Sequence, residues 1–313
     1  MYEEAIHRMN YAKGSVFGLM LLLPAVIAFL FDLLSGKDRV GNTKVKSFGT
    51  DESKAKRIVA CVILCIIVAA VLLPILSFIP VALSKNYPLD KSFSLSQFSY
   101  VMGSKNGLEY LSHSLFVSVA VALVGTLFAM LCAYMTARNA SPSLRILHLL
   151  SITSLAIPGI VLGLAYVLFF KASFIYGTFA IIILVNIVHF FASPYLMIYN
   201  SLRKLPPELE AVGATLGIGK VRLLRDVIIP QTAGTLCEMF AYFFINSMMT
   251  ISAISFLTNY KTEMFSLMLP QFDASQTSLA PPAIVAIIIL FANLIMKGII
   301  GLLKSKLRRP ESR

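Results

Sequence analysis

The sequence predicts an all-α fold of about seven transmembrane helices. Of its 313 residues, 58% are hydrophobic and only 13% are charged, whereas soluble domains carry about 25% charged residues. Seven apolar segments are long enough to cross a bilayer, which takes roughly 20 residues for a helix. Such long apolar runs favour helices, because a membrane-spanning β-strand would alternate polar and apolar residues over about ten positions.

The predicted helices are bounded by charged and turn-forming residues. Two longer connections, 84–112 and 258–281, are expected to contain short helices at the outer membrane surface. Pro158 with Gly159 favours a kink in the fourth helix, with local unwinding as the alternative. The seven predicted helices are 15–34, 58–83, 113–137, 146–170, 176–199, 235–257 and 282–303.

The distribution of basic residues predicts the orientation of these helices. The net charge is +12, but nineteen of the 27 Lys and Arg residues fall on one side when successive connections are assigned to alternate sides. This asymmetry follows the positive-inside rule. We therefore expect an inner-membrane protein with basic cytoplasmic loops, an external N-terminus and a cytoplasmic C-terminus, and no binding of nucleic acid.

Composition separates an outlying helix from a six-helix domain. The segment 35–57 is polar and rich in Lys and Gly, as is typical of a flexible linker. The predicted organisation is an outlying helix in 1–34, this cytoplasmic linker, a helical domain over 58–305 and a cytoplasmic tail over 306–313. The acidic N-terminal residues do not resemble a cleaved signal peptide. All four cysteines lie inside predicted helices, so neither a disulfide framework nor a metal cluster is expected.

The cytoplasmic loop 200–234 carries the most informative pattern. Pro206 and Pro207 end the preceding helix, and Glu208 and Glu210 follow in the first turn of the next one, where the helix dipole favours negative charge. Gly213 and Gly217 are four residues apart and predict a stripe without side chains that another surface can approach.

A second short amphipathic turn is expected directly after this stripe. Its basic residues are Lys220, Arg222 and Arg225, and its apolar residues Val221, Leu224 and Ile228 are expected on the opposite side. Two short helices joined at glycine would form a protruding elbow.

This loop resembles the EAA loop of ABC importer permeases, in which Glu-Ala-Ala, three residues, Gly and nine residues precede Ile-x-Leu-Pro. Gly217 is followed at that spacing by Val227, Ile229 and Pro230. The residues at the Glu-Ala-Ala positions are Ala211, Val212 and Gly213, with the acid at Glu210 instead. The resemblance implies that the loop couples to an ATPase through Glu208, Glu210, Ala211, Gly213, Gly217, Gly219, Lys220 and Pro230.

Three further segments resemble the permease branch that handles 2-aminoethylphosphonate, with ferric-iron permeases as close relatives. They read AIPGIVLGLAY (156–166), NIVHF (186–190) and FINSMMTISA (244–253). The resemblance implies the type I importer fold. Permeases of this branch are often fused doubles, and LLLPAVIAF (21–29) resembles the last helix of a first copy. The chain would then be the second half of a duplicated permease.

The resemblance implies a subunit of an ATP-driven importer. Its expected partners are a cytoplasmic ATPase dimer, an extracytoplasmic solute-binding protein and a second permease chain or half, either identical or different. A P-loop reads Gly, four residues, Gly-Lys and then Ser or Thr. The sequence around Gly219-Lys220 does not fit this pattern, because Ala214 stands at the first glycine position and Val221 at the hydroxyl position. No catalytic residue, metal or cofactor is expected in this chain. The expected solute is 2-aminoethylphosphonate or a related phosphonate, with ferric iron or thiamine as alternatives.

Polar side chains inside the predicted helices are candidates for the translocation path, because they are costly in lipid unless they face protein or water. Asn246 and Thr250 are expected on one helix face. The alternative is that such residues form hydrogen bonds between helices. The candidates are Asn186, His189, Asn246, Ser247, Thr250 and Ser252, together with Ser255.

Two other functional classes find little support in the sequence. A secondary transporter would need coupling-ion carboxylates inside its helices, and only Asp32 and Glu238 come close, both near helix ends. A membrane-embedded enzyme would need a cluster of His, Asp and Glu, and the four histidines are scattered.

Overall fold

A computed structural model describes residues 16, 18–24, 27, 54–139, 141–275 and 278–307. Most of the predicted helix 15–34, most of the linker 35–57 and the end of the tail lie outside the described residues. The chain divides into two compact units, each described here by itself. The larger, called the bundle, comprises Gly107–Leu267, Ile289–Arg313 and the N-terminal Met1–Phe29; the smaller comprises Leu30–Asn106 and Met268–Ile288.

Four described helices are long and apolar enough to cross a membrane. They are α2 (Lys54–Ala82), α4 (Gly107–Arg138), the continuous helical stretch Lys220–Met249 and α13 (Ala280–Leu307). Two bent helix pairs raise the number to six if each pair is one span. The helical fold is thus confirmed with four to six candidate spans in the described part of the chain.

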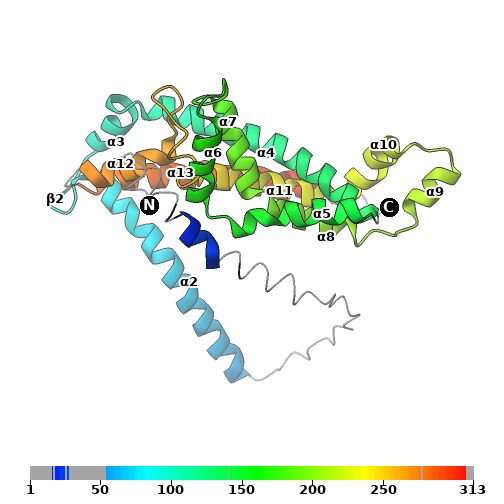
Figure 1. Ribbon diagram of the computed structural model, residues 1–313. Helices are drawn as coiled ribbons and strands as arrows, with labels where there is room; N and C mark the ends of the chain where they lie inside the picture. Colours follow the sequence, from blue (N-terminus) through cyan, green and yellow to red (C-terminus); the bar gives the residue numbers. More distant parts are fainter. Residues whose placement is uncertain are drawn as a thin grey trace. The chain divides into compact units, whose positions relative to one another are not determined.

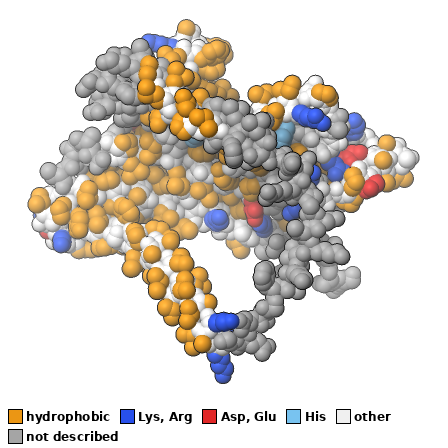
Figure 2. Space-filling model, turned by 60° about the horizontal axis from the view of Figure 1, so that its bottom comes forward, with side chains coloured by type: hydrophobic (Ala, Val, Ile, Leu, Met, Phe, Trp, Pro, Cys, Tyr) orange, Lys and Arg blue, Asp and Glu red, His pale blue; other side chains and the backbone are white. Residues whose placement is uncertain are grey.

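The smaller unit begins with α2, which carries Lys54, Lys56 and Arg57 at its N-terminal end. Figure 2 shows this helix as a rod covered with hydrophobic side chains and basic at its tip. A helix that is apolar all round is typical of a membrane span.

A short hairpin follows α2 in the smaller unit. The strands β1 (Ser84–Asn86) and β2 (Asp90–Phe93) pair antiparallel. They precede α3 (Ser96–Ser99) and the π-helix η2 (Tyr100–Ser104), and α12 (Met268–Ser275) lies just before α13. The prediction of short helices in the connections 84–112 and 258–281 is therefore confirmed, whereas the hairpin was not predicted. The location of these connections on the outer side stays a prediction.

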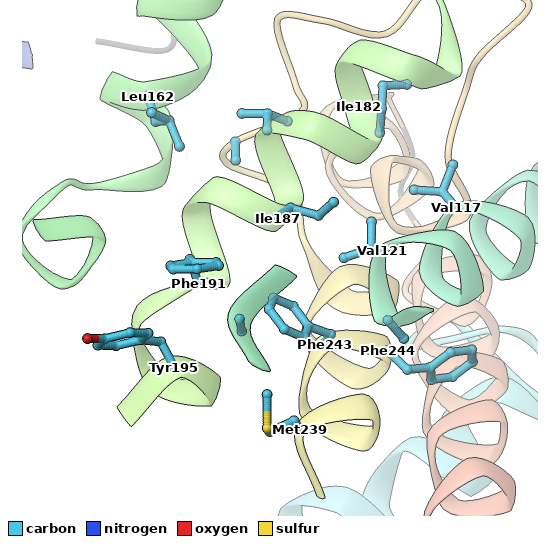
Figure 3. Packing of buried hydrophobic residues seen from close by; sticks show 14 of the residues in the cluster. Val117, Val121, Leu162, Ile182, Ile187, Phe191, Tyr195, Met239, Phe243 and Phe244 are labelled. Atoms are coloured by element: carbon cyan, nitrogen blue, oxygen red, sulfur yellow. The ribbon is translucent and has the colours of Figure 1, made fainter. Parts of the chain in front are cut away.

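The bundle is organised around α4, which lies beside α11 (Ile229–Met249) (Figure 1). Gly125 of α4 makes room for Phe243 of α11, because a Cβ atom at Gly125 would lie 2.9 Å from the Phe243 ring. Figure 3 shows the apolar core around this contact. The core includes Val117, Val121, Leu162, Ile182, Ile187, Phe191, Tyr195, Met239, Phe243 and Phe244.

The fourth predicted span is broken rather than kinked. It consists of α5 (Pro142–Ile152), the 3-10 turn η3 (Thr153–Ala156) and α6 (Gly159–Phe170), and the two halves meet at 111°. Ile157 is extended, with φ −99° and ψ 113°, which is the conformation that a following proline favours. The expectation of a kink at Pro158 was therefore wrong, and the helix ends there before restarting.

Two other predicted spans differ in detail. The fifth consists of α7 (Phe179–Phe190) and α8 (Ala192–Leu202), which are bent by 54°. The sixth starts before residue 235 and ends at Met249, because Thr250 is extended, with ψ 138°. The Thr250 carbonyl accepts a hydrogen bond of 2.6 Å from the Ser266 hydroxyl. Asn246 and Thr250 therefore do not share a helix face, contrary to the prediction.

Candidate functional site

The predicted elbow is present at one end of the bundle (Figure 1). It comprises α9 (Leu209–Thr215), α10 (Lys220–Leu223) and the π-helix η4 (Leu224–Ile228), which leads directly into α11. Glu208 is the N-cap residue of α9, and Glu210 lies in its first turn. The prediction of two short helices joined at glycine is confirmed.

Gly217 ends α9 through a Schellman motif. Its φ is +69°, and its N–H donates to the carbonyl of Ala214 (3.1 Å) while the N–H of Ile218 donates to that of Gly213 (2.8 Å). This pair of bonds defines the motif and requires a left-handed residue, usually glycine. Gly213 is instead buried against Leu223 of α10, and a Cβ added at Gly213 would lie 3.4 Å from Leu223 Cδ2. The prediction that the two glycines form one stripe on a helix face was therefore wrong.

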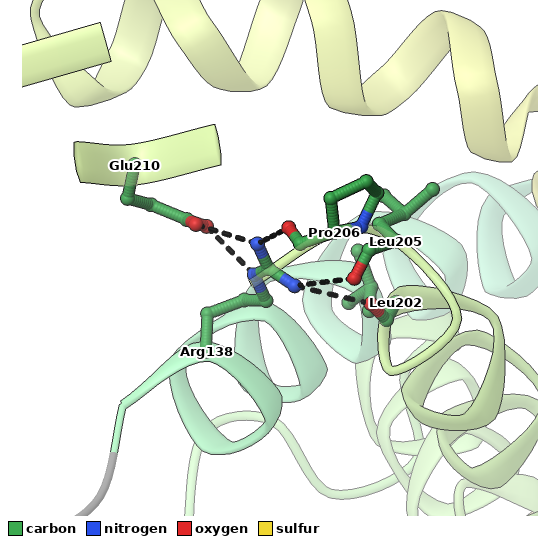
Figure 4. Close-up of polar contacts among 5 residues, drawn as sticks. All are labelled: Arg138, Leu202, Leu205, Pro206 and Glu210. Carbon is green, nitrogen blue, oxygen red and sulfur yellow. Dashed lines mark hydrogen bonds and ion pairs between the residues drawn. The ribbon is translucent and has the colours of Figure 1, made fainter. Parts of the chain in front are cut away.

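Glu210 is bound inside the chain by Arg138, the last residue of α4 (Figure 4). Arg138 Nε donates to Glu210 Oε1 (2.7 Å) and Nη2 to Oε2 (2.5 Å). The hydrogen bond from Arg138 lowers the pKa of Glu210 below its ordinary value. The carboxylate is thus ionised at neutral pH, and the stability that this bond contributes is lost only as the pH falls through the lowered pKa.

The remaining donors of Arg138 bind backbone carbonyls that connect α8 to α9. Nη1 donates to Leu205 (3.2 Å) and Leu202 (3.4 Å), and Nη2 donates to Pro206 (2.7 Å). All five N–H groups of the guanidinium therefore have partners. Sequence reasoning counted Arg138 only as a topology charge, because Glu210 lies 72 positions away and no local pattern links them.

The outer surface of the elbow is apolar and basic. Val212, Leu216 and Val221 are exposed by 52%, 69% and 80%. Leu223 is the buried residue of α10. Among the other predicted coupling residues, Glu208, Ala211, Gly219, Lys220 and Pro230 are also exposed.

A second candidate site lies at the broken span and is called here the polar break: Gly159, His189 and Ser252. A Cβ at Gly159 would lie 2.5 Å from Ser252 Oγ and 2.9 Å from His189 Nε2. The start of α6, the end of α7 and the segment after α11 therefore meet at one point. One turn further along α6, a Cβ at Gly163 would lie 2.5 Å from the carbonyl oxygen of Ala253.

The other predicted path residues have mixed surroundings. Asn186 and Ser247 are fully buried, and Asn186 Nδ2 donates to the carbonyl of Ile182 (2.9 Å). Asn186 Oδ1, Ser247 Oγ and His189 Nδ1 have no hydrogen-bond partner among the described residues. Asn246 and Ser255 bond to carbonyls four residues earlier.

A polar network that sequence reasoning missed joins α4, α5 and α8. The Tyr195 hydroxyl lies 2.6 Å from His148 Nδ1 and 2.8 Å from Thr136 Oγ1. Its members are far apart in the sequence, so no motif indicates it.

Glu238 is ion-paired with Lys304. No group of three or more His, Cys, Asp or Glu placed to hold a metal ion occurs in the described ranges.

A protein-family model described as "Binding-protein-dependent transport system inner membrane component" matches residues 125–309, which is more than half of the chain. The sulfate transport system permease protein of Salmonella typhimurium is 26% identical over 215 residues, covering 63% of this chain and 76% of that protein. A ferric transport system permease protein of Actinobacillus pleuropneumoniae is 24% identical, covering 56% of this chain and 26% of its own length.

A putative ferric transport system permease protein of Haemophilus influenzae is 21% identical, over 82% of this chain and 42% of that protein. The chain thus spans less than half the length of each of these two ferric relatives. Among solved structures, a bacterial ABC transporter involved in alginate import matches with a TM-score of 0.57 and 16% identity, over 83% of this chain and 99% of the other. An amino acid ABC transporter matches with a TM-score of 0.50 and 18% identity, over 68% and 100%. These structural matches inform the fold alone.

Proposed function

The chain belongs to the family of binding-protein-dependent transport system inner-membrane components. From this we propose that its elbow binds a cytoplasmic ATPase and transmits the conformational change of that ATPase to a solute path at the polar break. The protein is a multi-pass inner-membrane permease of an ABC importer and is not itself an enzyme. Membership implies an ATPase and a solute-binding protein as partners.

The single observation that carries the coupling role is the exposed apolar surface of the elbow. Leu216 and Val221 are exposed by 69% and 80% on the segment between α8 and α11. Exposed apolar residues gathered on a helical projection are typical of a surface that another protein covers. Lys220 and Arg222 beside them would favour an acidic partner surface.

The proposed path is supported by irregular backbone inside two of the predicted spans. The chain leaves the helical conformation at Ile157–Pro158 and again at Thr250. Such backbone is tolerated in a membrane only where it is buried in protein or lines an aqueous cavity. His189 and Ser252 both lie against Gly159, directly after the first break. We therefore propose them as path residues, with Asn186, Ser247 and Thr250 as supporting polar groups.

For the solute, we propose 2-aminoethylphosphonate or a related phosphonate. The support is the resemblance of three segments, and a relative named for sulfate, another tetrahedral oxyanion, is consistent with it. Ferric iron is the second candidate because three relatives are named for it.

We further propose that a second permease domain completes the pore, since one elbow serves one of the two ATPase subunits.

The test is reconstitution with the ATPase and solute-binding protein. We expect ATP hydrolysis to rise when the binding protein carries 2-aminoethylphosphonate, and the purified complex to have the mass of two permease domains and two ATPase subunits. Stimulation by a ferric complex instead would replace the solute. A rate of ATP hydrolysis that does not change with any loaded binding protein would contradict the coupling role.

The orientation proposed is cytoplasmic for the elbow and external for the connection after α11. In a variant whose four cysteines are replaced by alanine, we expect Tyr260→Cys to react with an impermeant maleimide in intact cells. Ala214→Cys, which is also exposed, should react only after the membrane is opened. The reverse pattern would invert the topology and remove the elbow from the ATPase side.

A further inference from the structure

The end of α4 and the elbow are joined by one buried side chain, Arg138. We propose, building on the function above, that Arg138 is a positioning residue that holds α9 rigidly to α4, so that displacement of the elbow moves α4 as well. The contact that carries this is the clamp that Arg138 forms with Glu210 and with the carbonyls of Leu202, Leu205 and Pro206.

The clamp contains a buried, bidentate ion pair, which is a strong type of polar contact. The Arg138 side chain is only 6% exposed, and both oxygens of Glu210 accept from it. Bidentate, charge-assisted pairs are more directional than single hydrogen bonds. The pair formed by Arg222 and Asp226 on the same elbow has side chains exposed by 79% and 52% and a separation of 3.4 Å, and pairs so exposed contribute little.

The clamp joins three elements of the bundle at one guanidinium. Leu202 is the last residue of α8. Its carbonyl accepts a hydrogen bond from the N–H of Leu205 (3.2 Å), and Arg138 adds a second donor at the helix C-terminus, where a cation is favoured. Glu210 belongs to α9, and Arg138 to α4. Only arginine presents five N–H donors in a fixed planar fork, so lysine, with three donors on one nitrogen, cannot make all five bonds.

The other end of α4 is bonded to the segment that follows the polar break. Ser114 Oγ accepts a hydrogen bond of 2.8 Å from the N–H of Phe265, and His113 Nδ1 lies 3.0 Å from the carbonyl oxygen of Glu263. A straight helix from Ser114 to Arg138 is about 36 Å long at 1.5 Å per residue. One continuous helix therefore connects the elbow to the segment 263–265, with Arg138 as its joint to α9.

The experiment uses the full chain in complex with its ATPase and binding protein. The variants are Arg138→Gln, Arg138→Lys, Glu210→Gln and the charge reversal Arg138→Glu with Glu210→Arg. Asp226→Asn is the matched control, because it breaks the exposed Arg222–Asp226 pair on the same elbow without removing a residue of the proposed ATPase surface. The readouts are the basal rate of ATP hydrolysis, its stimulation by loaded binding protein, and the mobility of a spin label at Ala214→Cys in α9, measured in the full-length permease.

We expect Arg138→Gln and Glu210→Gln to leave the complex assembled, with stimulation measured relative to the basal rate of the same complex. Stimulation should fall at least about tenfold, the effect of losing one charge-assisted hydrogen bond, and the label should become mobile. Arg138→Lys should not restore stimulation, the charge reversal should restore part of it, and Asp226→Asn should match the wild type. A role limited to folding would instead lower the amount of complex without changing stimulation per complex.

Full stimulation and an immobile label in Glu210→Gln would overturn the proposal. This variant keeps the three carbonyl bonds of Arg138, so it tests the clamp even if Arg138→Gln does not fold. If the wild-type complex shows no stimulation, the coupling function fails, and the label mobility still decides whether Arg138 fixes α9.

Discussion

Replacing Gly163 by alanine is expected to reduce transport at least tenfold and to lower the thermal stability of the permease. A Cβ at this position would lie 2.5 Å from the carbonyl oxygen of Ala253, 3.2 Å from its carbonyl carbon and 3.3 Å from Phe256 Cδ2. The nearest neighbour is backbone and cannot rotate away. Overpacking of this kind costs about 1–3 kcal/mol, and one tenfold change corresponds to about 1.4 kcal/mol.

The control for this prediction is Gly298→Ala in α13. No atom lies within 4 Å of the Cβ that alanine would add there, and alanine is favoured over glycine in a helix by about 1 kcal/mol. Gly298→Ala should therefore keep wild-type transport and thermal stability. The measurements are solute uptake into proteoliposomes and the melting temperature in detergent. Wild-type values for Gly163→Ala would show that α6 does not pack tightly on the segment after α11.

The long helices could be predicted because length alone identifies a membrane span. The segments 58–83, 113–137 and 282–303 correspond to α2, α4 and α13. The length of an apolar segment does not predict the angle between two helices at a break. Pro158 signals an interruption in the fourth span, but whether the two halves meet at 20° or at 111° depends on the tertiary contacts around Gly159 and His189.

The packing face of each helix was beyond sequence reasoning for a related reason. In α4, Val117 and Val121 are fully buried, whereas Phe116 and Leu127 are exposed by 59% and 62%. Because lipid tails are as apolar as a protein interior, the exposed face needs no polar residues, and the periodicity that marks a core in soluble proteins is absent.

The elbow was largely predictable because its signals are local. Two prolines, a glutamate in the first turn and glycines at fixed spacing indicate where α9 begins and ends. The clamp on Glu210 was not predictable, because Arg138 lies on another helix. Gly217 was assigned to a contact stripe, whereas its backbone φ of +69° shows that it serves the turn.

Replacing Gly217 by valine is expected to uncouple the ATPase. The turn holds residue 217 in the left-handed region, which is unfavourable by about 1–3 kcal/mol for a residue other than glycine and is worst for a β-branched one. The chain can relieve this strain by giving up the Schellman motif, and then Ile218 no longer bonds to Gly213 and α10 is no longer held against α9. Stimulated ATP hydrolysis should fall about tenfold or more, by the same arithmetic, while membrane insertion is unaffected.

Gly219→Val is the matched control, because it isolates the backbone from the added bulk. Gly219 lies two residues further along the same turn, and like Gly217 it has no atom within 4 Å of the position of an added Cβ. Its φ of −65° and ψ of 150° are accessible to valine. If the turn conformation is what coupling requires, Gly219→Val keeps most of the stimulation that Gly217→Val loses. Equal losses in both variants would instead mean that the added side chain obstructs the ATPase surface, and equal activity in both would mean that coupling does not depend on the shape of the elbow.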